Sequence, residues 1–252
     1  MRIPARRPVQ LGSRTLGGER SLICVPLVGR DREQLLDQAG RAVGAAPDAV
    51  EWRTDYLTGL TPEALPELLA ELRLAVGCPI IVTCRVANEG GVGEWSDAER
   101  IAILESALEA GADAIDIEQA TEGAGDLALR GRELGRPVIL SSHNFASTPP
   151  TPRLLEILER QQAMGAAVVK LAVMPNDPRD VARTLNACYE ARTTFLQTPL
   201  IAMSLGPLGA YSRVVGSLYG IDLTFAVVAE ASAPGQLAIG DLRAMRKALG
   251  VS

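Results

Sequence analysis

The chain has 252 residues, of which 47% are hydrophobic, and its formal net charge is −5. This apolar content suffices for a large core, and no apolar run reaches the roughly 18 residues that a membrane-spanning helix needs. The acidic balance, with a pI near 5.1, argues against a nucleic-acid surface, which requires clustered lysine and arginine. We therefore expect a globular cytoplasmic protein that binds neither nucleic acid nor membrane.

The start of the chain and the cysteines argue against secretion and against a metal site. The arginine-rich segment from Arg2 to Arg20 is not followed by an apolar segment of signal-peptide type. The cysteines are Cys24, Cys78, Cys84 and Cys188. Their spacing matches neither a set of metal ligands nor a disulfide framework, so we expect reduced, structural thiols.

Short β-rich runs recur roughly every 30 residues, and each precedes a segment with helical spacing, as in repeated βα units. The candidate strands span residues 21–27, 49–53, 79–85, 114–118, 137–143, 167–173, 200–205 and 223–228. Eight strands that alternate with eight helices favour a closed (β/α)8 TIM barrel over an open doubly wound sheet. The turn over residues 28–31 also lacks the glycine fingerprint of the open fold.

Several predicted helices carry start signals. The clearest helical segments span residues 31–45, 62–76, 97–110, 151–164, 178–192 and 239–249. Ser96 and Glu99 have the spacing of a capping box, and Asp177 and Thr61 each precede a proline at the first helical position.

The residues before the first strand contain two turn-forming pairs, Gly12-Ser13 and Gly17-Gly18. They predict an N-terminal β-hairpin that closes the barrel floor. No linker or low-complexity segment divides the chain. Although the length also permits two small domains, the strand count favours one barrel domain over residues 1–252.

Polar side chains cluster at the carboxyl ends of the predicted strands, where barrels of this type carry their active sites. Glu51 and Arg53 end the second strand and share one face of it, whereas Trp52 points to the other. Arg85 ends the third strand, and Glu89 follows in the next loop. Because the inside of such strands is normally apolar, these residues indicate a functional site.

His143 is the only histidine of the chain and ends the fifth strand, and Lys170 lies in the middle of the sixth. One interpretation is a proton shuttle beside a buried amine nucleophile, since desolvation favours the neutral amine that forms Schiff bases. The other is a structural histidine and a lysine that fills the barrel in a salt bridge with Glu51 or Glu118. Glu89 either orients the histidine ring or is a solvated loop residue.

Two features after the last strands are typical of ligand binding. Arg213 follows the seventh strand, in the loop or the first helical turn, where a guanidinium can bind a carboxylate through two hydrogen bonds. An isolated arginine is also commonly an exposed surface residue. Residues 231–236 are mostly small and hinge-rich, and they carry the hydrogen-bonding side chains of Ser232 and Gln236. This suits a lid that closes over a polar ligand, or a surface loop.

Taken together, the motifs resemble the type I 3-dehydroquinate dehydratases of the shikimate pathway over almost the whole chain. The matching stretches are Glu51 to Asp55, Thr83 to Arg85, Glu89 to Gly91, Ser142 to Phe145, Lys170 to Pro175, Met203-Ser204, Ser212-Arg213 and Ala231 to Gln236. Each stretch alone is a weak signal. Their order, their spacing and the placement of histidine and lysine on successive strands make the joint match specific.

The resemblance implies a (β/α)8 barrel, usually a homodimer, that converts 3-dehydroquinate to 3-dehydroshikimate and water without metal or organic cofactor. Lys170 would form an imine with the C3 ketone. His143, paired with Glu89, would carry the C2 proton to the leaving C1 hydroxyl in a syn elimination. The residues that would bind the substrate are Glu51, Arg53, Arg85, Arg213, Ser232 and Gln236.

The chain departs from the family pattern at Asn144, where members often have aspartate, and at Pro26, where they often have serine. Both changes bear on substrate affinity rather than on the type of reaction. Two alternatives stay open at this point. One is another Schiff-base barrel lyase of the class I aldolase or transaldolase type, and the other is a non-catalytic barrel that binds a carboxylate, because barrels host many functions.

Overall fold

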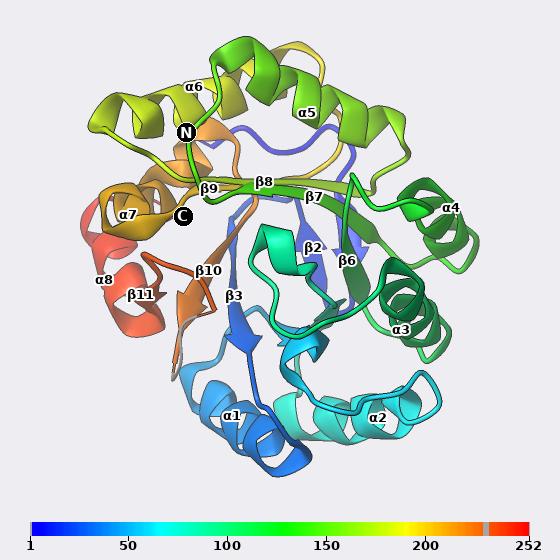
Figure 1. Cartoon of the computed structure of the whole chain (residues 1–252). Helices are drawn as coiled ribbons and strands as arrows, with labels where there is room; N and C mark the ends of the chain where they lie inside the picture. The colour runs from blue at the N-terminus through cyan, green and yellow to red at the C-terminus, as the bar shows by residue number, and fades with distance from the viewer. Residues whose placement is uncertain (1, 229–231, 252) are drawn as a thin grey trace.

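The structure, a computed structural model, describes residues 2–228 and 232–251. Eight parallel strands form a ring with helices around it (Figure 1). They are β3 (Leu22–Leu27), β4 (Ala49–Arg53), β5 (Ile80–Thr83), β6 (Ala114–Glu118), β7 (Val138–Asn144), β8 (Val168–Val173), β9 (Leu200–Ser204) and β10 (Leu223–Val227). The strands pair in chain order, and β10 pairs with both β9 and β3, which closes the ring. The predicted (β/α)8 barrel is confirmed.

Eight helices of the described residues surround the barrel. They are α1 (Arg32–Ala45), α2 (Leu65–Val76), α3 (Asp97–Glu109), α4 (Ala124–Glu133), α5 (Thr151–Ala163), α6 (Pro178–Thr194), α7 (Gly206–Val215) and α8 (Ile239–Ala248). Their apolar faces cover the outside of the strands, where Trp52 of β4 is fully buried, as the strand alternation predicts. In the described part of the chain, no helix has the length and apolar character to cross a membrane.

Two of the three predicted helix starts are confirmed. Ser96 and Glu99 form a capping box at the start of α3, and Asp177 caps α6. The third, Thr61-Pro62, is wrong, because α2 begins at Leu65. The Thr61 hydroxyl accepts a hydrogen bond from a backbone N–H three residues later and closes a separate turn before the helix.

A hairpin of β1 (Val9–Leu11) and β2 (Arg14–Leu16) precedes the barrel, as predicted. Leu11 and Leu16 are each 1% exposed and pack with the first residues of the barrel strands, such as Leu22 and Val168. The hairpin turn needs Gly12, whose φ is +52° and where a Cβ would lie 2.7 Å from the Asp113 carboxylate. The amino ends of the strands are thus covered, and the carboxyl ends are left for the site.

Strand bounds differ from the predictions at two places that concern the site. β5 ends at Thr83, so Arg85 lies just past the strand rather than in it. The backbone N–H of Arg85 donates to the Asp55 carboxylate, 3.3 Å away, instead of to a neighbouring strand. A short strand that the sequence did not indicate, β11 (Leu237–Ala238), pairs with the end of β10. At the end of β5 a polar side chain replaces the hydrogen bonds between strands, and at the end of β10 a returning loop adds a short strand.

Candidate active site

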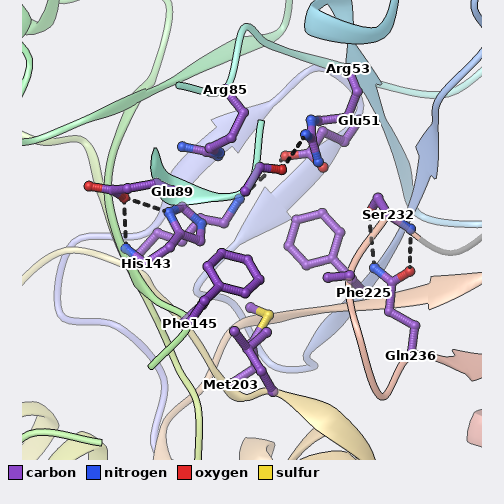
Figure 2. Close-up of a pocket in the computed structure, with 15 residues that line it drawn as sticks. Glu51, Arg53, Arg85, Glu89, His143, Phe145, Met203, Phe225, Ser232 and Gln236 are labelled. Atoms are coloured by element: carbon purple, nitrogen blue, oxygen red, sulfur yellow. Dashed lines mark hydrogen bonds and ion pairs between the residues drawn. The ribbon is translucent and has the colours of Figure 1, made fainter. Parts of the chain in front are cut away.

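A pocket with about 430 Å³ of space free of protein atoms opens at the carboxyl ends of the strands (Figure 2). Eight of the nine predicted site residues line it: Glu51, Arg53, Arg85, Glu89, His143, Lys170, Ser232 and Gln236. Apolar side chains, among them Phe145, Met203 and Phe225, complete the wall. The pocket therefore combines an apolar wall with a few converging charged groups, as small-molecule sites do.

Lys170 is 4% exposed and lies between two carboxylates. Its Nζ is 2.6 Å from Asp116 Oδ2 and 3.3 Å from Glu51 Oε1, and it lies 4.7 Å from the centre of the Phe225 ring. These four residues come from alternate strands, β4, β6, β8 and β10, which is how a barrel builds one interior layer. The salt bridge to Glu51 is confirmed, whereas the suggested partner Glu118 is wrong.

Asp116 is the closest partner of Lys170, and the sequence reasoning missed it. Burial opposes its ionisation, yet the positive charges of Arg85 and Lys170 hold its pKa well below the ordinary value of an aspartate. The signal was present in the sequence of β6, Ala-Ile-Asp-Ile-Glu, where two acids alternate with isoleucines. Alternation places both carboxylates on the inner face of a strand that is otherwise apolar.

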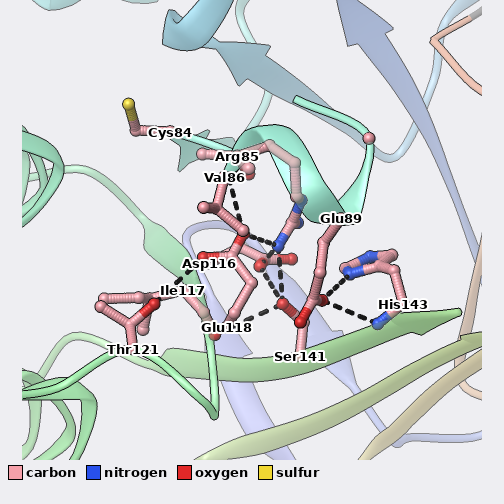
Figure 3. A network of polar contacts seen from close by, with 12 residues as sticks. Cys84, Arg85, Val86, Glu89, Asp116, Ile117, Glu118, Thr121, Ser141 and His143 are labelled. Carbon is pink, nitrogen blue, oxygen red and sulfur yellow. Dashed lines mark hydrogen bonds and ion pairs between the residues drawn. The ribbon is translucent and has the colours of Figure 1, made fainter. Parts of the chain in front are cut away.

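A row of alternating charges, here called the charge row, runs from Lys170 through Asp116, Arg85 and Glu118 to Arg100 of α3. Figure 3 shows its middle part, where Arg85 lies between Asp116 and Glu118. Arg85 Nη2 lies 2.7 Å from Asp116 Oδ1, and Arg85 Nη1 lies 2.5 Å from Glu118 Oε1. All five side chains are 5% exposed or less. Since removal of one partner leaves a buried charge unpaired, each member holds its neighbours in place.

His143 is held by Glu89, which lies at the end of the 3-10 turn η2 (Ala87–Glu89). Glu89 Oε2 lies 2.9 Å from His143 Nδ1 and accepts a second hydrogen bond, of 2.8 Å, from the backbone N–H of the histidine (Figure 2). The interpretation of Glu89 as a solvated loop residue is wrong, since its side chain is only 15% exposed. A carboxylate accepts from Nδ1–H, so Nε2 is the acceptor of the ring.

The surroundings favour a neutral imidazole. Burial lowers the pKa of His143 well below 6.5, and the positive charges of Arg85 and Lys170 lower it further, while Asp116 opposes them. Burial raises the pKa of Glu89, against the hydrogen bond from the His143 backbone and the charge of Arg85. A neutral ring near pH 7 has a free lone pair and is able to accept a proton.

Arg53 and Glu51 are also fixed in the pocket by neighbours. Arg53 makes two hydrogen bonds to the Asp55 carboxylate, of 2.8 and 2.7 Å, and its guanidinium lies 5.0 Å from the centre of the Tyr56 ring. The Thr83 hydroxyl donates to Glu51 Oε1 over 2.9 Å. These contacts hold both side chains in place in the pocket wall.

Arg213 differs from its predicted placement. It lies in the last turn of α7 rather than in the loop or first turn, and it is 1% exposed rather than a surface residue. Its guanidinium donates to the carbonyl oxygens of Gly235, at 3.0 Å, and Pro234, at 3.3 Å. Burial lowers its pKa to about 10. Arg213 thus lies behind the pocket and holds the backbone of the predicted lid.

Ser232 and Gln236 of the predicted lid contact each other. The Ser232 backbone N–H donates to Gln236 Oε1 over 3.0 Å, and Gln236 Nε2 lies 3.1 Å from Ser232 Oγ (Figure 2). Ala231, the first residue of this motif, lies outside the described residues. The pair closes one side of the pocket and presents amide and hydroxyl groups to it.

A sequence model of the family described as type I 3-dehydroquinase matches residues 23–252. The chain belongs to the type I 3-dehydroquinase family. A 3-dehydroquinate dehydratase of Klebsiella pneumoniae is 40% identical over 228 residues, which cover 88% of this chain and 91% of the relative. One of Bacillus subtilis is 35% identical over 92% of each chain.

Solved structures agree with this membership of the type I 3-dehydroquinase family. The 3-dehydroquinate dehydratase of Geobacillus kaustophilus superposes with a TM-score of 0.95 at 34% identity, over 99% of this chain and 98% of that one. The type I enzyme of Clostridium difficile, solved with covalently modified comenic acid, has a TM-score of 0.91 at 31% identity, over 96% and 97%. The family supports neither of the two alternatives that the sequence left open.

The single histidine allows a direct test of the electrostatics of the site. We expect the imidazole signal of His143 to keep the shifts of a neutral ring when the pH falls through 6.5, measured by carbon-edited NMR. Burial and the charges of Arg85 and Lys170 are the physical reason. An ordinary titration with a midpoint near 6.5 in the folded protein would contradict this assignment.

The same shift has a consequence for stability. Above pH 6.5 the ring is neutral in the folded and unfolded chains, so it contributes nothing to the pH dependence. Below pH 6.5 the unfolded chain binds a proton that the folded chain does not, so the free energy of unfolding should fall as the pH falls. Comparison with His143→Gln, whose side chain does not titrate, isolates this contribution.

Proposed function

We propose that this chain is a 3-dehydroquinate dehydratase that uses Lys170 as an imine-forming nucleophile and His143 as the proton carrier. The reaction removes water from 3-dehydroquinate by syn elimination and yields 3-dehydroshikimate, in the shikimate pathway. Family membership supports the reaction. The observation that carries the assignment of residues is the pocket in which a buried lysine faces a histidine-carboxylate pair.

In the first step, Lys170 Nζ attacks the C3 ketone, and the carbonyl oxygen leaves as water. The attack requires the Nζ lone pair, so the proton shared with the carboxylates must move, and Asp116 Oδ2, at 2.6 Å, is the nearest acceptor. The protonated imine keeps a positive charge at the same atom. Asp116 and Glu51 therefore offset a charge that is present both before and after imine formation.

In the second step, His143 Nε2 accepts the C2 proton, which the protonated imine acidifies by withdrawing electrons. The electron pair of the C–H bond passes into an enamine. The enamine then expels the C1 hydroxyl, which takes the proton back from His143 and leaves as water. Hydrolysis of the unsaturated imine returns the ketone and the free Lys170 amine. Glu89 keeps the ring oriented because it accepts from Nδ1–H.

We assign the remaining pocket residues to substrate binding. Ser232 and Gln236 present a hydroxyl and an amide to the pocket, which suits the substrate carboxylate. Arg213 would join them if its guanidinium gave up the hydrogen bond to the Gly235 carbonyl oxygen and donated to the substrate carboxylate, which is a stronger acceptor. The ring hydroxyls would be bound by Glu51, Arg53 and Arg85, which line the same pocket.

We also propose that residues 1–252 act as one domain, that two chains form a homodimer, and that the protein works in the cytoplasm. The continuous ladder of the barrel supports one domain. The resemblance to the family supports the dimer. The acidic composition is consistent with a cytoplasmic location.

Imine formation is tested by trapping. We expect that incubation with 3-dehydroquinate and reduction with borohydride adds to Lys170 the mass of the substrate or product imine plus two hydrogens, as measured by peptide mass spectrometry. The chain offers an internal control, since Lys247 is its only other lysine. Labelling of Lys247 to the same extent, or none on Lys170, would reject the imine.

The role of the histidine is tested by substitution. We expect His143→Ala to lower kcat by about 10²–10⁴-fold, the usual contribution of a general acid-base group, in an assay that follows the ultraviolet absorbance of the conjugated product. Asn144→Ala, next in the chain, is the matched control. If His143→Ala kept full turnover while Lys170 was still trapped, only the proton-transfer assignment would be wrong.

A further inference from the structure

A second cleft lies at the opposite end of the barrel, where the strands begin. It contains about 630 Å³ of space free of protein atoms, between the start of β3, the residue before β4 and helix α8. Its lining includes four cationic side chains and one carboxylate, namely Arg20, Arg243, Arg246, Lys247 and Asp48. The cleft therefore carries a formal charge of +3 in a chain whose net charge is −5.

The one carboxylate is already neutralised. Both oxygens of Asp48 accept from Arg20, at 2.8 and 2.5 Å, and one of them also accepts from the Ile23 backbone N–H at 2.9 Å. Among the residues that the structure describes, no acidic side chain forms a salt bridge with Arg243, Arg246 or Lys247. Within residues 2–228 and 232–251, three positive charges thus line the cleft without a salt bridge to an acidic side chain.

Helix ends explain two of these three cations. Arg243 donates to the carbonyl oxygens of Ala45 and Ala46, at 2.6 and 2.5 Å, and so completes the end of α1. Lys247 is exposed in the last turn of α8, where a cation interacts favourably with the helix dipole. Arg246 also lies in the last turn of α8 and donates to the Arg213 carbonyl oxygen near the end of α7. Unlike Lys247 it is buried, and these contacts leave its Nε without a described partner.

Arg246 is 5% exposed, and its one hydrogen bond to a described residue joins Nη2 to the carbonyl oxygen of Arg213 over 2.9 Å. Its Nε is buried and has no partner within the described ranges, and the same holds for the hydroxyl of Ser21, which is 3% exposed. Burial, with the nearby charge of Arg2, lowers the pKa of Arg246 to about 10. A buried guanidinium without an anion is costly, so donors of this kind are normally paired.

We propose that this cleft binds an oxyanion, a phosphate or carboxylate group of a small metabolite, with Arg246, Lys247 and Ser21 as its donors. A guanidinium matches the paired oxygens of such a group, and the ammonium adds a mobile point charge at the rim. The bond from Arg246 to Arg213 links the cleft to the residue that holds the lid of the active site. This inference does not depend on the proposed function.

The test titrates inorganic phosphate into the full chain at constant ionic strength and measures binding by calorimetry. We expect saturable binding of one phosphate per chain. Arg246→Met should weaken it by about tenfold or more, as expected for the loss of a charged hydrogen bond, and Lys247→Gln by a few-fold. Arg160→Gln, which removes an exposed arginine on α5 and the same net charge, should leave the affinity unchanged.

Absence of saturable binding would overturn the proposal. So would affinities of Arg246→Met and Lys247→Gln that both equal the affinity of the unsubstituted chain, because the phosphate would then bind elsewhere, such as in the active site. If circular dichroism shows that Arg246→Met does not fold, Lys247→Gln and Ser21→Ala decide the question, since neither side chain makes a described hydrogen bond. A parallel titration with malonate distinguishes a phosphate group from a carboxylate group as the natural ligand. Tighter binding of phosphate assigns a phosphorylated metabolite, and tighter binding of malonate assigns a dicarboxylate.

Discussion

Two carboxylates buried on one strand constrain most of the candidate site. Asp116 and Glu118 of β6 are 0% and 1% exposed, inside a barrel whose interior is normally filled by branched apolar residues. Two buried anions are tolerated only if cations and hydrogen bonds surround them. Lys170, Arg85 and Arg100 supply those cations, and the charge row that results joins Lys170 to helix α3.

The same carboxylates position the loop that carries Glu89. After β5 ends, the backbone N–H of Val86 donates to Glu118 Oε1, and the Arg85 side chain is held by both acids. The loop therefore leaves the barrel in a defined direction, and Glu89 reaches the His143 ring at 2.9 Å. The proposed proton carrier His143 and the proposed nucleophile Lys170 are thus arranged by one electrostatic system, and the charge of Lys170 helps to lower the pKa of His143.

The sequence predicted those features that depend on local periodicity. Strand alternation placed Glu51 and Arg53 inward and Trp52 outward, and the count of βα units predicted the barrel. It did not predict that Asp116 is the partner of Lys170, because that contact joins alternate strands across the barrel and depends on how an interior layer is built. Arg213 was misplaced for a related reason: its burial depends on the lid segment, which returns to α7 from a distant part of the chain.

The central claim is that the reaction passes through an imine on Lys170, and the fate of the ketone oxygen tests it most directly. An imine releases the C3 oxygen as water, and hydrolysis installs a new oxygen from the solvent. In water enriched in oxygen-18, a short reaction should therefore yield product labelled at C3 in every turnover, well above the spontaneous exchange of the ketone measured without enzyme. Product that keeps its original C3 oxygen would contradict the imine and the role given to Lys170.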